Sequence, residues 1–129
     1  MVLPASVALA LTAPAEVLTA EAGGTRLAYL AWNRHDVAKP ALLLAHGYRG
    51  HGYWWSPVAP FLTDRFRVYA LSFSGMGDSG WRAHYDYSVF AQDLLGVLDH
   101  AGAASAYLVG HSFGGSMVLR AAAAAPAIA

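Results

Sequence analysis

The chain alternates short, fully apolar runs with longer segments in which apolar residues recur at helical spacing. Residues 41–45, ALLLA, are apolar at every position, which is typical of a strand buried on both faces of a sheet. Further on, Phe90, Leu94 and Leu98 fall on one face of a predicted helix, which Gly102 would end. The same patterns predict strands at 16–22, 25–32, 66–73 and 106–109, an irregular helix within 53–63 and a helix at 113–125.

The order of these elements predicts an α/β fold with a mostly parallel sheet flanked by helices, because strands and helices alternate after the first two strands. Those two strands are separated by Gly23-Gly24, a turn signal that predicts an N-terminal hairpin. A length of 129 residues is enough for one domain with a hydrophobic core.

The first fifteen residues, MVLPASVALALTAPA, carry no charge and are interrupted by Pro4 and Pro14. A secretory signal peptide begins with basic residues, which are absent here. We therefore expect a first strand or a loose arm, and a signal peptide is the less favoured alternative. The segment is too short and too interrupted to span a bilayer, so we expect no membrane association.

The composition narrows the classes of function. Hydrophobic residues make up 57% of the chain and charged residues 12%, which argues against disorder. Eight basic and eight acidic residues give a net charge of zero, whereas a nucleic-acid-binding surface needs a basic stripe. The chain has no cysteine, which excludes disulfides, thiolate catalysis and cysteine-based zinc sites. This absence fits a reducing compartment, and we expect a cytoplasmic protein, with secretion as the less favoured alternative.

A candidate nucleophile lies in Gly110-His111-Ser112-Phe113-Gly114, which follows a predicted strand and opens a predicted helix. This G-x-S-x-G pattern is typical of a nucleophile elbow, a strained turn that projects the serine hydroxyl off the edge of a sheet. Glycine at 110 and 114 supplies the small neighbours that a cramped backbone requires. We expect unfavourable backbone angles at Ser112. The alternative interpretation is a simple tight turn and helix cap.

A second motif, His46-Gly47-Tyr48-Arg49-Gly50, directly follows the ALLLA strand. Acyl transfer creates an oxyanion, which needs fixed N–H donors. We expect the backbone N–H groups of Tyr48 and Phe113 to supply them in one shared cavity. Gly47 would let this loop turn its N–H groups toward a ligand.

His46 is interpreted as a residue that braces this loop, with a general base as the alternative. His46 and His51 could also be regarded as a metal-binding pair. However, neither an acidic nor a thiol partner lies nearby in the sequence, so we predict no metal site.

The segment Gly75-Met76-Gly77-Asp78-Ser79-Gly80 matches the dinucleotide-binding pattern G-x-G-x-x-G after a strand. In that pattern the third glycine opens a helix, and an acidic residue ends the next strand. Here residues 81–84 have the composition of a loop, and the strand at 106–109 is followed by Gly110-His111. Dinucleotide binding is therefore the less favoured alternative, and we predict no cofactor.

Together, the ALLLAHGYRG loop, the LSFSGMGDSGW turn and VGHSFGG resemble the α/β-hydrolase superfamily, from about residue 20 to residue 126. The resemblance implies an eight-stranded sheet flanked by helices and a triad in the order Ser, then Asp or Glu, then His. Ser112 matches the nucleophile, and Tyr48 and Phe113 match the oxyanion positions. Ser72 stands where the family usually has an Asp, three residues before the Gly of the LSFSGMGDSGW turn, and this difference bears on the hydrogen bonding of that turn.

The triad acid and base of this family follow the nucleophile helix, and no Asp, Glu or His follows Ser112 here. The ionisable residues that precede it give no credible triad in our interpretation; they include Asp78, Asp86, Asp93, Asp99, His84, His100 and His111. We therefore expect residues 1–129 to form a single, incomplete α/β-hydrolase domain.

The resemblance implies a serine hydrolase that attacks an ester-like carbonyl of a small-molecule substrate through a Ser112 acyl-enzyme, and that is inactive without its acid and base. Acyl transfer, C–C bond hydrolysis and cofactor-free peroxidation fit the motifs equally, and a non-catalytic binding module on the same fold is the alternative. The aromatic residues Tyr48, Trp54, Trp55 and Phe113 are candidates for a pocket or for the core. We also expect self-association through the strand at 106–109, which would be an exposed edge.

Overall fold

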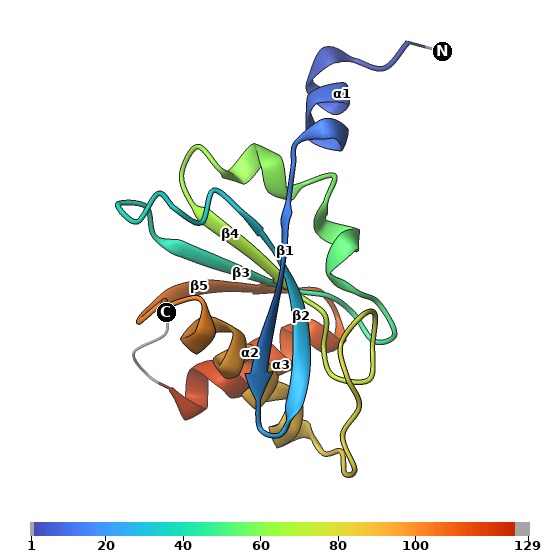
Figure 1. The fold of residues 1–129 in the computed structure, drawn as a ribbon, viewed down its shortest axis with the longest axis vertical. Helices are drawn as coiled ribbons and strands as arrows, with labels where there is room; N and C mark the ends of the chain where they lie inside the picture. The colour runs from blue at the N-terminus through green and yellow to red at the C-terminus, as the bar shows by residue number, and fades with distance from the viewer. Residues whose placement is uncertain (1, 126–129) are drawn as a thin grey trace.

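The structure, a computed structural model, describes residues 2–125, and within them the strands form one five-stranded sheet of order β1-β2-β4-β3-β5 (Figure 1). β1 (Glu16–Ala22) and β2 (Thr25–Trp32) form the expected antiparallel hairpin. β3 (Ala41–Ala45) pairs in parallel with β4 (Arg67–Leu71) on one side and with β5 (Ala106–Gly110) on the other. β2 and β4 pair antiparallel. The prediction of an α/β fold with an N-terminal hairpin is confirmed, and the sheet is mixed, with the expected parallel pairing at its core between β4, β3 and β5.

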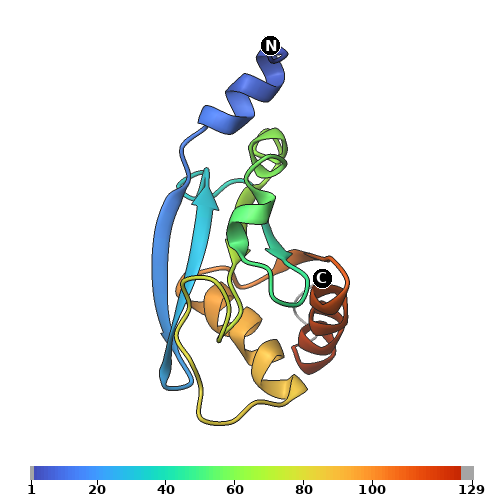
Figure 2. The same ribbon diagram turned by 90° about the vertical axis from the view of Figure 1, so that its right-hand side faces the viewer.

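Helices pack on both faces of the sheet (Figure 2). α2 (Tyr87–His100) and α3 (Phe113–Ala124) lie against each other on one face. Two short 3₁₀ helices, η1 (Gly52–Trp55) and η2 (Ala59–Leu62), cover part of the other face. The sheet therefore separates a larger core under α2 and α3 from a smaller one under η1 and η2.

β3 is apolar at every position because it faces both cores. Ala41, Leu43 and Ala45 belong to the core under α2 and α3, whereas Leu42 and Leu44 belong to the core under η1 and η2. Successive side chains of a strand point to opposite faces of the sheet. Burial on both faces is thus the physical reason for the ALLLA run.

The N-terminal segment differs from the sequence prediction. It forms a helix, α1 (Ala5–Thr12), rather than a strand or a loose arm, and this helix projects beyond the sheet (Figure 1). Alanine and leucine are strong helix formers, and the Ala8 N–H donates to the Pro4 carbonyl (3.0 Å) to close the first turn. Among residues 2–125, no helix has the length and the apolar character that a membrane span requires.

The irregular helix predicted within residues 53–63 consists of η1 and η2 as separate elements. Pro57 follows η1 and Pro60 lies in the first turn of η2. Because proline lacks the N–H that a continuous α-helix needs, the segment breaks into two short helices.

β5 lies at the edge of the sheet, with no strand on its outer side within the described part of the chain. Toward α3, Ala106 is buried and Leu108 is partly buried. On the opposite face, the side chains of Tyr107 and Val109 remain 53% and 45% exposed. Phe66 contacts Tyr107 there, with ring centroids 5.7 Å apart. The edge strand therefore carries an apolar face that is only partly covered.

A buried histidine connects the ends of β3 and β4. His46, the first residue after β3, accepts a hydrogen bond at Nε2 from the N–H of Phe73, two residues after β4 (3.1 Å). Its Nδ1 lies 2.6 Å from the carbonyl oxygen of Gly47, so Nδ1 carries the proton and donates it. Burial lowers the pKa of His46, because the charged imidazolium would lose its solvation. Both ring nitrogens are occupied in the neutral form, so neither is available to act as a general base.

Two glycines let α3 begin in direct contact with the ends of β3 and β5. A Cβ on Gly114, in the first turn of α3, would fall on the carbonyl oxygens of Ala45 and His46. A Cβ on Gly110, the last residue of β5, would fall on the backbone of Gly114. Backbone therefore packs on backbone at this point, which fixes where the helix starts relative to the sheet.

The substitution Gly114→Ala is expected to lower the free energy of unfolding by about 3 kcal/mol, because the added methyl group meets backbone that cannot move aside alone. Gly115→Ala is the matched control, since a Cβ there lies 3.4 Å from the nearest atom, the Gly110 carbonyl oxygen. It should be neutral, or stabilising by up to about 1 kcal/mol. Urea unfolding followed by circular dichroism measures both, and equal losses in the two variants would contradict the packing argument.

Protonation of His46 is expected to destabilise the fold at mildly acidic pH. Burial lowers the pKa of His46 in the folded state. The neutral ring therefore makes its full contribution to the free energy of unfolding above the unfolded-state pKa of about 6.5, and this contribution is lost as the pH falls toward the folded-state pKa. The loss is about 1.4 kcal/mol for each pH unit within that window.

Urea midpoints at about pH 7.5 and about pH 5.5 measure this loss, and His46→Gln should show a smaller decrease between them than the wild type. His35→Gln is the control, because that side chain is 77% exposed and its surface contact with Glu16 (3.5 Å) contributes little to stability, so this variant should nearly keep the wild-type decrease. An unchanged decrease in His46→Gln would refute the assignment.

Candidate active site

Ser112 occupies the turn between β5 and α3 in a strained conformation. Its φ and ψ angles are 53° and −117°, and its side chain is exposed. A non-glycine residue with positive φ persists only where the surrounding structure holds it. Here the His111 N–H donates to the Ala45 carbonyl (3.0 Å) and the Gly115 N–H donates to the Ser112 carbonyl (2.9 Å). The unfavourable backbone angles expected of an elbow are therefore present.

The loop after β3 lies next to this turn. The rings of Tyr48 and Phe113 are in edge-on contact, with centroids 5.8 Å apart. Arg49 has a φ of 63°, and the Gly50 N–H donates to the Gly47 carbonyl (3.0 Å), so the loop turns tightly. Within residues 2–125, neither the Tyr48 N–H nor the Phe113 N–H donates to a backbone carbonyl. Both groups are thus unengaged near the elbow, and their convergence on one oxyanion stays a prediction.

The upstream acids and histidines make no hydrogen bond to the nucleophile among the described residues. Asp93 is fully buried and pairs with Arg82 (2.6 Å), whereas the ring of His100 bonds to the hydroxyl of Tyr29 (2.8 Å). Within this part of the chain, Ser112 is therefore not hydrogen-bonded to a group that could act as its general base.

The glycine-rich loop after β4 lacks the form of a dinucleotide-binding turn. Gly75 and Gly77 have positive φ angles of 75° and 52°. However, no helix begins at Gly80, and α2 starts only at Tyr87. Without a helix N-terminus at this turn, the feature that binds the pyrophosphate in such sites is missing.

Ser72 organises the base of this loop at the position where the resemblance leads one to expect an aspartate. Its hydroxyl accepts from the N–H of Gly52 (3.0 Å), and its carbonyl accepts from the hydroxyl of Ser79 (2.6 Å). The Ser79 hydroxyl also accepts from the N–H of Ala28 (2.8 Å). Neutral hydroxyl groups thus connect this loop to β2 and to η1.

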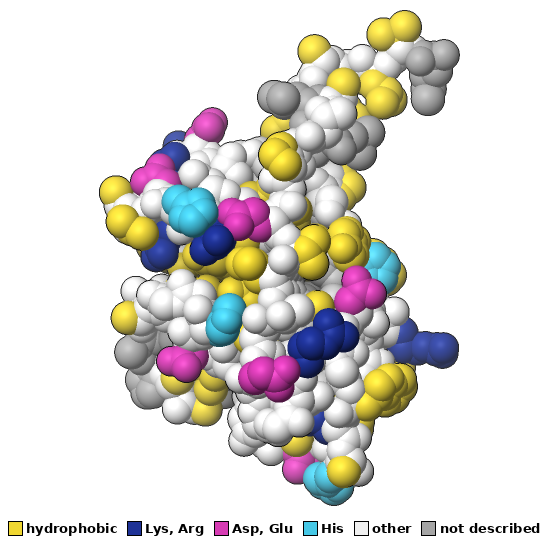
Figure 3. Space-filling model, in the orientation of Figure 1, with side chains coloured by type: hydrophobic (Ala, Val, Ile, Leu, Met, Phe, Trp, Pro, Cys, Tyr) yellow, Lys and Arg dark blue, Asp and Glu magenta, His cyan; other side chains and the backbone are white. Residues whose placement is uncertain are grey.

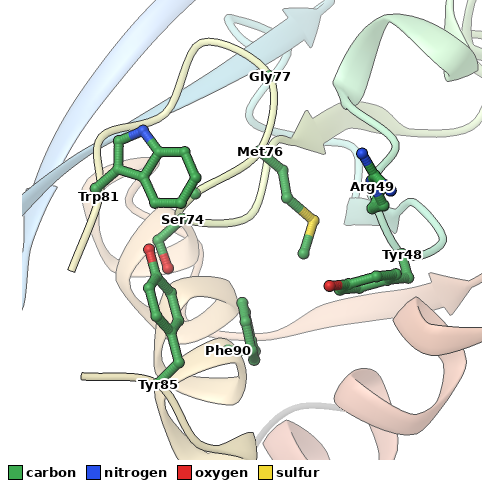
Figure 4. Close-up of a pocket in the computed structure, with 9 residues that line it drawn as sticks. Tyr48, Arg49, Ser74, Met76, Gly77, Trp81, Tyr85 and Phe90 are labelled. Carbon is green, nitrogen blue, oxygen red and sulfur yellow. The ribbon is translucent and has the colours of Figure 1, made fainter. Parts of the chain in front are cut away.

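A pocket of about 660 Å³ lies between the loop after β3 and the loop after β4 (Figure 4). Ser74 and Arg49 contribute its polar side chains. The ring of Phe90 contacts that of Phe113, the residue after Ser112, with centroids 5.1 Å apart, so the pocket adjoins the elbow. Aromatic and apolar side chains form most of the wall: Tyr48, Met76, Trp81, Tyr85 and Phe90.

The four aromatic residues that the sequence analysis named as pocket candidates do not line a single pocket. Trp54 and Trp55 line a separate cavity of about 270 Å³, together with His46, Gly47 and His111. Tyr48 alone of the four lines the larger pocket. His111, which precedes Ser112, thus lines the smaller cavity, whereas Phe113, which follows Ser112, contacts Phe90 of the larger pocket.

Sequence reasoning missed most residues of the larger pocket, including Arg49, Ser74, Trp81 and Tyr85. A signal was present, because the LSFSGMGDSGW turn follows a buried strand of the parallel part of the sheet. Ligands of such sheets bind outside the carboxyl ends of the strands. Figure 4 shows this loop opposite the loop that carries Tyr48.

Comparison with known proteins agrees with this geometry. A model of the alpha/beta hydrolase fold family matches residues 40–128. The chain is 38% identical over 87 residues to a pimeloyl-(acyl-carrier protein) methyl ester esterase of Methylococcus capsulatus, covering 67% of this chain and 33% of that protein. It is 35% identical over 95 residues to epoxide hydrolase B of Mycobacterium tuberculosis, covering 70% of this chain and 27% of the relative.

Among solved structures, the chain is similar to epoxide hydrolase A from Mycobacterium thermoresistibile, with a TM-score of 0.80 and 30% identity. The match covers 88% of this chain and 36% of that one. The chain thus corresponds to about a third of the length of such relatives. With a strained serine between a parallel strand and a helix, and a family match over most of its length, the chain belongs to the alpha/beta hydrolase fold family.

Proposed function

We propose that this chain carries the nucleophile and the oxyanion-binding part of a serine hydrolase that acts on ester-like carbonyl substrates. The observation that supports this most directly is Ser112, exposed and strained at the turn where β5 meets α3. Strain of this kind at an accessible nucleophile is typical of a functional position. The similarity to a methyl ester esterase supports an ester as the substrate class.

In this proposal the Ser112 Oγ attacks the carbonyl carbon of the substrate while its proton passes to a base. The carbonyl oxygen becomes negatively charged and accepts hydrogen bonds from the N–H groups of Tyr48 and Phe113. Collapse of this intermediate breaks the bond to the leaving group, which takes the proton from the base. Water then cleaves the acyl group from Ser112 by the same route.

The base and its orienting acid are proposed to come from segments that follow α3 in the longer relatives. Two observations support this: no acid or histidine bonds to Ser112 within the described residues, and the relatives are about three times longer than the matched region. On this proposal, residues 1–129 are one incomplete domain, and their hydrolase activity alone is low.

Two alternatives remain compatible with the fold. A non-catalytic binding module would explain the lack of a base beside Ser112. Epoxide hydrolases among the relatives indicate that the fold also acts on electrophiles other than esters. The reactivity of Ser112 toward an acylating or phosphonylating probe distinguishes these alternatives from the serine hydrolase.

The 129-residue chain is expected to hydrolyse 4-nitrophenyl acetate at a rate close to background. Loss of a triad member lowers kcat on the order of a million-fold, and about a thousand-fold acceleration over water remains from binding and oxyanion stabilisation. Ser112→Ala should leave most of this remaining acceleration, because binding and oxyanion stabilisation do not depend on the serine hydroxyl. Turnover of many per second, abolished in Ser112→Ala, would instead show that a base acts within this chain.

Incubation with a fluorophosphonate and added imidazole, which supplies the general base proposed to lie outside these residues, should modify Ser112, and peptide mass spectrometry would locate the adduct. Ser116→Ala is the matched control, because Ser116 is also exposed and lies one turn further along α3. This variant should keep the adduct, and Ser112→Ala should lose it. Absence of any adduct on Ser112 in the wild type would favour the non-catalytic module.

We further propose that a second copy of this chain is the partner of the exposed edge strand. β5 has no neighbour on its outer side within residues 2–125, and Tyr107 and Val109 are about half exposed on one face. An unpaired strand edge with apolar side chains is a template for pairing with another strand.

Sedimentation velocity should therefore show concentration-dependent association of the chain. Val109→Lys should weaken it, because a charge on an edge strand opposes pairing between sheets. Val37→Lys is the control, since Val37 is 78% exposed in the loop between β2 and β3, and it should associate like the wild type. A monomeric wild type at all concentrations would refute this proposal.

A further inference from the structure

The pocket beside the elbow carries one unpaired cation and no anion. Among the described residues, Arg49 lines it, and no aspartate or glutamate does. Within the described residues, the Arg49 guanidinium takes part in no ion pair or hydrogen bond. Its backbone is held in the left-handed region (φ 63°) directly after Tyr48. The charge of this pocket therefore favours an anionic group.

The pocket also contains a buried hydroxyl without a partner. Ser74 is 1% exposed, and its Oγ has no hydrogen bond within residues 2–125. Its backbone is fixed, because the N–H donates to Asp93 Oδ2 (2.8 Å), and Asp93 is held by Arg82. A buried hydroxyl without a partner destabilises a protein, and native structures leave few of them. Ser74 lines the pocket, so a rotation of its side chain would bring this hydroxyl to a bound ligand.

The rest of the wall suits a flat or extended apolar group. The rings of Tyr85 and Phe90 stack with centroids 5.3 Å apart and an interplanar angle of 22°. Figure 4 shows them on the side of the pocket opposite Tyr48, with the Met76 side chain pointing into the space between. A volume of about 660 Å³ lies within the range of small-molecule sites.

We propose that this pocket binds an organic carboxylate with an aryl or alkyl body, with Arg49 holding the carboxylate and Ser74 bonding to a polar atom of the body. Taken with the proposed function, on which this last step rests, the substrate is an ester that carries a free carboxylate group. The ester carbonyl would lie at Ser112, and the free carboxylate would lie at Arg49. Binding itself requires no turnover, so it can be tested without the hydrolase chemistry.

The test compares 3-phenylpropanoate with its neutral amide, 3-phenylpropanamide, by NMR chemical-shift titration of the full chain. The wild type should bind the carboxylate about five- to tenfold more tightly, as expected of a charge-assisted hydrogen bond at a partly solvated site. In Arg49→Gln this preference should fall below about twofold. Arg65→Gln, a change at an exposed arginine outside the pocket, should keep it. Equal binding of the two probes by the wild type, or an equal loss in both variants, would overturn the role of Arg49.

Ser74 is tested with 3-(4-hydroxyphenyl)propanoate against 3-phenylpropanoate. Ser74→Ala should raise the urea midpoint, because it removes a buried unpaired hydroxyl, and should weaken binding of the hydroxylated probe more than that of the other. A lower midpoint with an unchanged ratio of affinities would refute its role as a ligand-binding residue.

The variant Ser112→Ala tests ligand binding apart from hydrolase chemistry, because this variant should bind all three probes as tightly as the wild type does. Absence of binding in both proteins would overturn the pocket proposal and leave the fluorophosphonate experiment to decide the reactivity of Ser112. Binding without a Ser112 adduct would support the pocket and contradict the hydrolase.

Discussion

The backbone contact between the first turn of α3 and the end of β3 determines the geometry of the site. Because Gly114 has no Cβ, the helix approaches the carbonyl oxygens of Ala45 and His46 directly. The chain then has only a short turn in which to pass from β5 into α3, and Ser112 takes a positive φ there. The same end of β3 leads into the loop that carries Tyr48. One close approach of backbone therefore places the candidate nucleophile and the candidate oxyanion loop side by side.

The opposite wall of the pocket depends on a buried ion pair. Asp93 accepts from the Ser74 N–H and pairs with Arg82, which in turn donates to the carbonyls of Ala22 and Gly23 in the first hairpin. Breaking such a pair leaves a buried charge uncompensated, which costs about 3–5 kcal/mol. The ion pair thus connects α2 and the hairpin to the loop after β4. The position of Ser74 in the pocket is a consequence of this contact.

Membership of the alpha/beta hydrolase fold family does not by itself select a substrate, because its members include esterases and epoxide hydrolases. In our proposal, the features of this chain that bear on the substrate lie in the loops after β3 and β4. The strained serine concerns how a substrate would be attacked, whereas Arg49 and Ser74 concern which substrate would be held beside it. In this proposal, attack on the substrate and recognition of the substrate depend on different residues, so each can be tested separately.

The sequence by itself determined those parts of the fold in which the local pattern of residues reflects their burial or packing in the folded protein. ALLLA predicted a strand buried on both faces, and the G-x-S-x-G pattern predicted a strained turn, because close backbone packing there admits only glycine. The helix at the N-terminus was not predicted, since an uncharged apolar stretch with two prolines has no distinctive period. Only the tertiary structure decided the pocket, because Arg49 lies in the loop after β3, whereas Ser74 and Tyr85 lie in the loop between β4 and α2. Contacts between such residues depend on the order and register of the strands, which no local sequence pattern encodes.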